Sequence, residues 1–436
     1  MNFSVSNIYL LIYILLWVIL FIYHRKRTKE FGVASLVIGF CLVFSIVSFI
    51  LYNSKSFEGE YGELTLFPFI YLFFMFWLIL LPGIKYQKAN VMYIQMPSNF
   101  FLYLFLFGYA VTSILVIPKS ISTLYIGLIS LFSDIEVGQE MYILTRDSYV
   151  ASDRSISGIF GLFSIFHGLF KDIAVFFFFY YVSLKNRKKS YLIFYIIVLL
   201  VNVLISISKG GRTPFVMNLY IITIGYFIFY YYWDIKTQRI ARKIASIMLL
   251  LVSIPFIVLT ISRFGDREDT GGTFGSILSY AGQAPLNFNL YAMDANGIRN
   301  GDRTFNEFKS LLGFYVPNDI NSVRFKYRHM NIDDSKFITF VGDFVLDFGP
   351  YVALLIFSFF SLLFVYKTKS LGNSISFHRL LLVYFTLVIV LQGAMYLFNY
   401  SFMGNWTILT FILVYFGLYF DYKAQTNRKY ISKTIE

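Results

Sequence analysis

The sequence has few of the residues on which a metal enzyme or a disulfide-rich domain depends. Of its 436 residues only 14% are charged, four are histidine and one, Cys41, is cysteine. A single cysteine excludes a disulfide within the chain, and no group of histidines and cysteines has the spacing of metal ligands. A glycine-rich loop of the P-loop or dinucleotide-binding type is also absent. The sequence therefore indicates no metal and no other cofactor.

Hydrophobic residues take the place of the missing charged ones. They make up 58% of the chain, and aromatic residues alone make up 21%, which is more than soluble globular domains contain. The formal net charge of +13 would suggest a nucleic-acid partner in a soluble protein, but in a membrane protein it reports basic residues in cytoplasmic loops. We therefore expect an all-α, polytopic membrane protein that binds no nucleic acid.

Runs of about 20 apolar residues, long enough to cross a bilayer as a helix, recur along the chain. The first run ends in a basic cluster and lacks both a basic region before it and a small-residue cleavage site, so we expect a retained helix and not a cleaved signal. The sequence predicts about eleven spans, which form one integral membrane domain over residues 1–436. They are expected at residues 7–23, 31–52, 66–82, 98–117, 156–184, 190–208, 213–233, 244–262, 337–366, 380–398 and 404–421.

The basic residues between these spans indicate the orientation of the helices. If the first helix runs from outside to inside, more than half of the 37 Lys and Arg residues fall in short inner segments, as they do in cytoplasmic loops. We expect the protein in the cytoplasmic (inner) membrane, with its amino terminus outside and its carboxyl terminus in the cytoplasm.

Two long polar segments fall on the outer side in this topology. Residues 118–155 begin with a run rich in Ser, Leu and Ile, 120–133, which we expect to form a helix lying along the membrane surface. In residues 263–336 charged residues alternate with aromatic ones. Because disordered segments are poor in aromatics and long structureless loops are uncommon, we expect this outer loop to form helical pieces packed over the mouth of the membrane bundle.

The turn between two spans at residues 208–214, Ser-Lys-Gly-Gly-Arg-Thr-Pro, is the first candidate site. Gly210 and Gly211 leave backbone amides accessible beside Lys209 and Arg212, and the helix that follows points its positive amino-terminal end at the same place. This arrangement suits an anion such as phosphate. The alternative is a tight helical hairpin whose basic side chains reach the membrane interface.

The start of the 263–336 segment is the second candidate. Arg263, Asp266, Arg267 and Glu268 lie within a few residues of one another, so they could hold a diphosphate and place a carboxylate near it. The alternative is a solvated loop whose charges pair with one another, since exposed ion pairs contribute only about 0–1 kcal/mol. Arg263 is the stronger candidate for binding because it is closest to the hydrocarbon.

Charged residues also occur inside two predicted spans. His167, Lys171 and Asp172 lie in an apolar run, where ionisable groups are costly and indicate either a functional site or a buried structural pair. Asp343 and Asp347 lie one turn apart on one face of the ninth span, where they could orient sugar hydroxyls or an arginine. Acids also favour the amino-terminal end of a helix, and for this pair we expect that simpler role.

Taken together, these features resemble the O-antigen and capsule polymerases of the Wzy type, the oligosaccharide repeat unit polymerases. The resemblance implies a GT-C-like membrane fold and an inverting, metal-independent glycosyltransferase. Its substrate would be an oligosaccharide carried on undecaprenyl diphosphate, polymerised into a surface polysaccharide on the outer face of the membrane. The similar features are the turn at Gly210, Gly211 and Arg212, the outer segment that starts Arg-Phe-Gly-Asp-Arg at residue 263, the run Tyr-Ala-Gly-Gln-Ala-Pro at 280–285, and Asp343 with Asp347-Phe348-Gly349.

The resemblance also implies roles for individual residues. Arg212 corresponds to the arginine that ends the family's Gly-Ser-Arg-like turn, with Gly211 at the middle position here, and Arg263 to a loop arginine that contacts the diphosphate. An acceptor hydroxyl would need a base, and the candidates are Asp266, Glu268 and His329, the last being the single histidine of the large outer loop. Aromatic residues such as Tyr280 would stack on sugar rings. The implied partners are the lipid-linked oligosaccharide, membrane lipid, and a chain-length regulator and flippase of the same pathway.

The sequence leaves two other functions open. A lipid-linked oligosaccharide flippase would suit the intramembrane Lys171 and Asp172, but it has no need of a large charged and aromatic outer loop. Another GT-C-type transferase, such as an O-antigen ligase, would share the topology.

Overall fold

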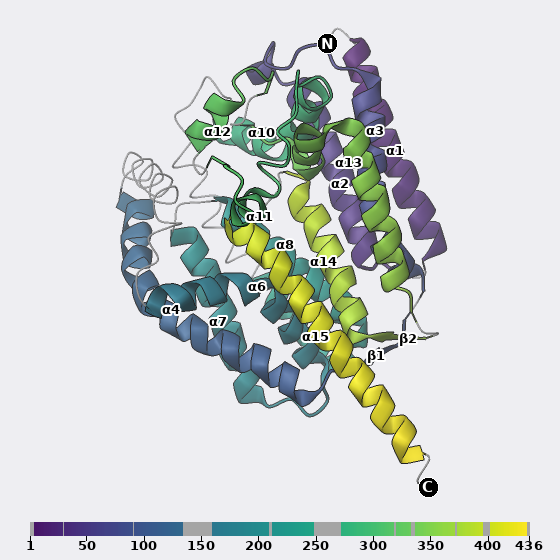
Figure 1. Cartoon of the computed structure of the whole chain (residues 1–436), viewed down its shortest axis with the longest axis vertical. Helices are drawn as coiled ribbons and strands as arrows, with labels where there is room; N and C mark the ends of the chain where they lie inside the picture. Colours follow the sequence, from purple (N-terminus) through teal and green to yellow (C-terminus); the bar gives the residue numbers. More distant parts are fainter. Residues whose placement is uncertain are drawn as a thin grey trace. The chain divides into compact units, whose positions relative to one another are not determined.

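A computed structural model describes the chain at residues 4–28, 30–89, 91–133, 159–208, 212–247, 272–317, 320–332, 336–370, 373–395 and 402–433. Within these ranges the side chains of 117–133, 159–161, 200–208, 212–215, 320–321, 402–403 and 427–433 are outside the description. The described residues are mostly helical (Figure 1). Seven helices among them are long and apolar enough to cross a membrane, which confirms a helical membrane protein. A count of about eleven spans and a GT-C-like arrangement remain predictions.

The chain divides into two compact units. The first comprises residues 1–90, 266–369 and 385–405, and the second comprises residues 91–265, 370–384 and 406–436. The helices of the first unit are α1 (Val5–Arg27), α2 (Val33–Tyr52), α3 (Leu66–Lys88), α10 (Gly272–Asn287), α11 (Asn306–Leu311), α12 (Ile320–Lys326) and α13 (Thr339–Lys367). α1 packs against α2 and α3, α13 packs against α3, and α10 packs against α2.

The second unit is also helical. In it α4 packs against α6 and α7, and both α6 and α7 pack against α8. A short parallel pair of strands, β1 (Tyr93–Gln95) and β2 (Ser374–Ser376), joins two connecting segments of this unit. Its main helices are α4 (Asn99–Ser133), α6 (Ile159–Ser183), α7 (Lys189–Ser208), α8 (Arg212–Phe229) and most of α15 (Phe402–Lys433), while α14 (Phe377–Gly393) passes from this unit into the first.

Two predicted helices, at residues 120–133 and 244–262, need separate comment. Residues 120–133 are helical as expected, but they continue α4 without a break through Pro118 and do not start a separate helix. Their expected position along the membrane surface stays a prediction. Of the predicted span at 244–262 only the first few residues are described, as the end of a helix at 235–247.

The polar segment 263–336, which the sequence predicts to be outside and which we call the polar outer loop, forms helical pieces in its described part, as predicted. Its first described helix, α10, is docked closely on the membrane helices of its unit. Gly282 of α10 lies so near the α2 backbone that a Cβ atom there would be 2.9 Å from the carbonyl oxygen of Val47. The Ser48 hydroxyl donates a hydrogen bond to the Gly282 carbonyl oxygen at 2.8 Å. Close helix contact of this kind requires a small residue, which gives the glycine of the Tyr-Ala-Gly-Gln-Ala-Pro run a structural role.

All of these contacts gather at one end of the first unit. A π-helical turn (η4, Phe288–Ala292) follows α10, and in it the Asn289 side chain donates to the Thr65 carbonyl oxygen (2.7 Å) and accepts from the Thr65 N–H (3.0 Å). Thr65 immediately precedes α3, and Val47 and Ser48 lie in the last turns of α2. The basic residues of α1, α3 and α13 lie in the last turns of these helices, at their other ends. The outer loop and the basic ends therefore lie on opposite sides of this unit.

Candidate functional site

α13 is broken at Gly349, and the break separates two unlike segments. Gly349 has φ 78° and ψ 162°, a conformation that is essentially restricted to glycine, and Pro350 follows it without an N–H group. The Tyr71 hydroxyl donates to the Pro350 carbonyl oxygen at 2.6 Å. Side chains from Thr339 to Asp347 are almost all buried, whereas apolar side chains after the break are widely exposed. The first segment is thus covered by protein, and the second has the surface of a lipid-facing helix.

Arg299 covers the first segment of α13. Its Nε donates to an Asp347 carboxylate oxygen at 2.7 Å, and one terminal nitrogen lies 3.3 Å from an Asp343 carboxylate oxygen. Its backbone N–H donates to the Leu346 carbonyl oxygen at 2.8 Å. The side chains of Arg299, Asp343 and Asp347 are all 0% exposed, so all three charges have been removed from water. Burial of this kind is tolerated only where the charges are paired and hydrogen-bonded.

Arg303 completes this cluster and reaches the surface. Its Nε lies 3.2 Å from the same Asp343 oxygen, and its side chain is 18% exposed. The Thr304 backbone N–H donates to the second Asp347 oxygen at 2.7 Å. Two arginines thus balance two carboxylates, and we refer to Arg299, Arg303, Asp343 and Asp347 as the Arg–Asp cluster. Because its buried partners fix Asp343, they also fix the guanidinium of Arg303.

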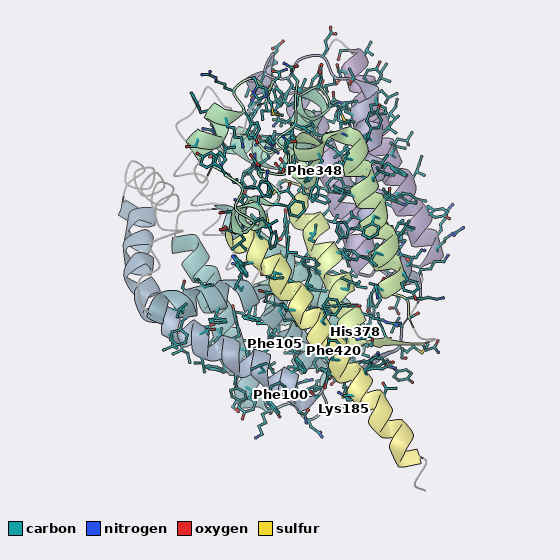
Figure 2. The ribbon with its side chains drawn as sticks, viewed as in Figure 1. Phe100, Phe105, Lys185, Phe348, His378 and Phe420 are labelled. Carbon is teal, nitrogen blue, oxygen red and sulfur yellow. The ribbon has the colours of Figure 1, made fainter. Side chains whose placement is uncertain are left out.

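The turn that carries both arginines is a repeated tetrapeptide. Residues 296–303 read Asn-Gly-Ile-Arg-Asn-Gly-Asp-Arg. Both asparagines have φ 53° and both glycines have positive φ, the left-handed region that Gly and Asn tolerate best. Gly301 lies against Phe348 of α13, where a Cβ atom would come within 3.1 Å of the ring (Phe348 is labelled in Figure 2). The repeat therefore places two arginines four residues apart, and the two aspartates of α13 have the same spacing.

A second group of charges holds the same turn to α11 and α12. Asp302 is buried, and its carboxylate accepts hydrogen bonds from the ammonium groups of Lys309 and Lys326. The Tyr327 hydroxyl lies within hydrogen-bonding distance of Asp302 and of the Arg299 carbonyl oxygen (2.9 Å). Burial alone would raise the pKa of Asp302, but the hydrogen bonds from the two lysines and Tyr327 outweigh it and lower the pKa below its ordinary value. Burial, and then the bond to Asp302, raises the pKa of Tyr327.

Asp343 and Asp347 lie together, as predicted from the sequence, but their role differs from the expected effect on the end of the helix. Both carboxylates bind arginine, which is the other role that the sequence left open for them. His329 is exposed and lies outside the Arg–Asp cluster, with its ring 6.3 Å from that of Tyr327. Tyr280 points its ring at Phe337, 5.1 Å away. Gln283 of the same run accepts a hydrogen bond from the Phe337 N–H at 3.3 Å.

Most of the predicted anion-binding residues lie outside the described part of the chain. Arg212 begins α8, but its side chain is outside the described part of the chain. The same is true of Lys209, Gly210, Gly211, Arg263, Asp266, Arg267 and Glu268. Their roles stay predictions.

The intramembrane residues of α6 belong to the second unit. The His167 ring stacks on Tyr109 with 4.8 Å between centroids, and its Nδ1 lies 3.1 Å from the Ser113 hydroxyl. Lys171 donates to the Asn218 side-chain oxygen at 3.4 Å. Asp172 is 3% exposed, and among the described residues its Oδ1 has no hydrogen-bond partner.

Comparison of the chain with protein-family models, curated proteins and solved structures finds no match. Its function is therefore inferred from its residues and their geometry.

Proposed function

We propose that the protein is a glycosyltransferase of the cytoplasmic membrane that polymerises oligosaccharide units carried on undecaprenyl diphosphate. The observation that best supports this is the partly exposed Arg303, held by the buried Arg–Asp cluster in a folded polar segment at one end of a membrane-helix unit. A membrane enzyme whose lipid-linked substrate lies in the bilayer and whose sugars lie in water needs a polar site at this boundary.

The charge requirement of the reaction supports the same proposal. Transfer from a lipid diphosphate leaves negative charge on the departing diphosphate, and fixed cations that meet this charge lower the barrier. Arginine binds phosphate oxygens through two parallel hydrogen bonds. Arg303 is partly exposed, and Lys309 and Lys326, which are also partly exposed, join the same turn through Asp302. We assign Arg303 to the diphosphate. Separately, Arg212 and Arg263 keep the diphosphate-binding role that the sequence resemblance gives them.

The remaining roles follow the sequence predictions. From the sequence, Lys209, Gly210, Gly211 and Arg267 are candidate donors for the diphosphate. Asp266, Glu268 and His329 are the candidates for the base toward the acceptor hydroxyl. The exposed position of His329 leaves it accessible to an acceptor.

The proposal is tested in a strain that makes a surface polysaccharide and lacks its own copy of this protein. Arg303→Ala should remove long chains and leave single capped units, because export and ligation still work. Arg303→Lys retains a cation but not the paired donors, so it should restore part of the chain length. Lys55→Ala, which changes an exposed basic residue outside the cluster, is the matched control and should give the normal pattern. Arg212→Ala and Arg263→Ala should act like Arg303→Ala.

The amount of each variant in the membrane is measured beside the polysaccharide. A normal ladder from Arg303→Ala would remove this residue from the proposed site. Loss of the ladder from every variant, including Lys55→Ala, would indicate misfolding and not lost chemistry.

One observation favours a transporter as the alternative. A buried Asp172 whose Oδ1 has no hydrogen-bond partner among the described residues, beside a lysine in a membrane helix, is typical of a transport pathway. In that case a deletion strain would accumulate lipid-linked units on the inner leaflet and make no capped units. Deletion of a polymerase would instead leave single units on the cell surface.

A further inference from the structure

An apolar surface on the polar outer loop is explained by neither the helix packing nor the proposed chemistry. Five large side chains, Leu311, Leu312, Phe314, Tyr315 and Phe325, are between 61% and 81% exposed. Val316, Tyr327 and Met330, their neighbours in sequence, are buried. The segment is therefore folded, and these five side chains point outward from it. Exposed apolar groups at this density mark a surface that contacts a membrane or another molecule.

The break in α13 indicates where the membrane begins relative to this surface. From Pro350 to Lys367 the helix is about 27 Å long at 1.5 Å per residue, close to the ~30 Å of the hydrocarbon core. Widely exposed apolar side chains, such as Tyr351, Leu355 and Leu362, occur after the break. The segment before the break is buried under Arg299 and its turn. The boundary of the hydrocarbon therefore lies close to Gly349.

α11 starts at the level of this boundary. The Phe305 ring lies 5.9 Å from the ring of Phe348, the residue immediately before the break. Phe305 also precedes the first residue of α11, which ends at Leu311 after six residues. The exposed residues 311–315 thus follow within two helical turns of the boundary, close enough to reach lipid.

The charges around the apolar residues match a lipid headgroup region. Arg324 and Arg328 are exposed, and the guanidinium of Arg328 lies over the Phe325 ring, 4.7 Å from its centroid. Between residues 308 and 332 the sequence has one acidic residue, Asp319, against four basic ones, Lys309, Arg324, Lys326 and Arg328. Aromatic and basic side chains together are the composition of segments that bind the interface of anionic membranes.

We propose that Leu311, Leu312, Phe314, Tyr315 and Phe325 form a lipid anchor that inserts into the adjacent membrane interface, with Arg324 and Arg328 at anionic headgroups. This anchor would hold the turn with Arg303 at a fixed height above the bilayer. The assignment depends on the position of the membrane boundary and not on the proposed transferase activity, so each is tested without the other.

Spin labels measure the depth directly. Cys41 is buried and is the only cysteine, so a Cys41→Ala background allows single cysteines to be placed at positions 312, 314, 315 and 325. Each labelled protein is placed in nanodiscs of phosphatidylethanolamine and phosphatidylglycerol. The collision rates of the label with oxygen, which concentrates in lipid, and with a water-soluble nickel chelate are then compared. Leu362→Cys on the exposed face of α13 provides the lipid control, and Asp294→Cys, at an exposed loop position, provides the water control.

The four test positions should show oxygen-to-nickel ratios between those of the two controls, as expected at an interface. Ratios equal to that of the water control would overturn the proposal and would indicate a soluble partner or a saccharide surface. A second arm replaces phosphatidylglycerol with phosphatidylcholine. Removal of the anionic lipid should lower the ratio at position 325, and Arg324→Gln with Arg328→Gln should abolish that lipid dependence. A lipid dependence that survives both substitutions would overturn the assignment of the two arginines to headgroups.

Discussion

Arg299 and Asp347 form an ion pair from which water is excluded: the Arg299 Nε is 2.7 Å from the Asp347 Oδ1, and both side chains are 0% exposed. The two residues lie 48 positions apart in the chain, so the pair ties the polar outer loop to a membrane helix. Asp343 shares Arg299 with Asp347 and binds Arg303 as well. The pair thus fixes the turn on α13 at the point where the partly exposed Arg303 is oriented.

Replacing Arg299 by alanine should be strongly destabilising. The change leaves Asp347 buried without its cationic partner, and breaking a buried pair in this way costs about 3–5 kcal/mol. In detergent, the thermal midpoint of Arg299→Ala should fall well below that of the parent protein. Arg303→Ala should cost much less, because Asp343 keeps Arg299 and the Arg303 side chain is partly exposed. Equal losses from the two variants would contradict the different roles given to the two arginines.

A second substitution, at Asp347, tests whether the unpaired charge is the cause of the destabilisation. Arg299→Gln with Asp347→Asn removes both charges and leaves groups that can hydrogen-bond. Because coupled residues do not contribute additively, the double variant should be more stable than Arg299→Gln alone. No recovery would mean that the shape of the arginine, and not its charge, holds the segment.

The positions of the helices could be predicted from hydropathy, but the Arg–Asp cluster could not. Long apolar runs define α1, α2 and α3 almost without reference to other parts of the chain. The pairing of Arg299 with Asp343 and Asp347 depends on a long-range contact whose distance no local pattern specifies. One local signal was present: the tandem Asn-Gly-x-Arg repeat spaces its arginines by four residues, as the helix spaces its aspartates. We expected the two aspartates to favour the amino-terminal end of their helix electrostatically. That expectation was wrong because it considered only α13 and not the arginines of the 296–303 turn.

The pH dependence of stability should report Asp302. Its pKa is lowered in the folded protein by Lys309, Lys326 and Tyr327 against the opposing effect of burial. A lowered pKa means that the folded state favours the carboxylate, so its contribution to stability is complete above the ordinary value of about 3.9. It is lost as the pH falls through the folded value. The difference in thermal midpoint between the parent and Asp302→Asn should therefore be constant near neutral pH and shrink below about pH 4. A difference independent of pH over that range would show that the carboxylate charge is not what holds α11 and α12.

Gly349 should not tolerate a side chain. Alanine at φ 78° and ψ 162° would either strain the backbone, at a cost of about 1–3 kcal/mol, or straighten α13 and pull Asp343 and Asp347 away from their arginines. Gly39→Ala is the matched control, because Gly39 lies in α2 of the same unit and a Cβ atom there makes an ordinary contact with Phe21 at 3.6 Å. Thermal midpoints in detergent should fall for Gly349→Ala and stay level or rise for Gly39→Ala. A neutral Gly349→Ala would mean that the break is not needed for the cluster.

The predicted topology can be tested with reporter fusions, and the structure supplies a physical reason for the expected result. The last turns of α1, α3 and α13 carry basic residues, among them Arg27, Lys88 and Lys367, and α10 contacts the opposite end of their unit through Ser48 and Gly282. If basic ends face the cytoplasm, the polar outer loop faces outward. An alkaline phosphatase fused after Thr270 should be active and one fused after Glu436 inactive, with the reverse for a cytoplasmic reporter such as green fluorescent protein. The opposite pattern would place Arg303 and the Arg–Asp cluster on the cytoplasmic side, where a polymerase that acts on exported units could not use them.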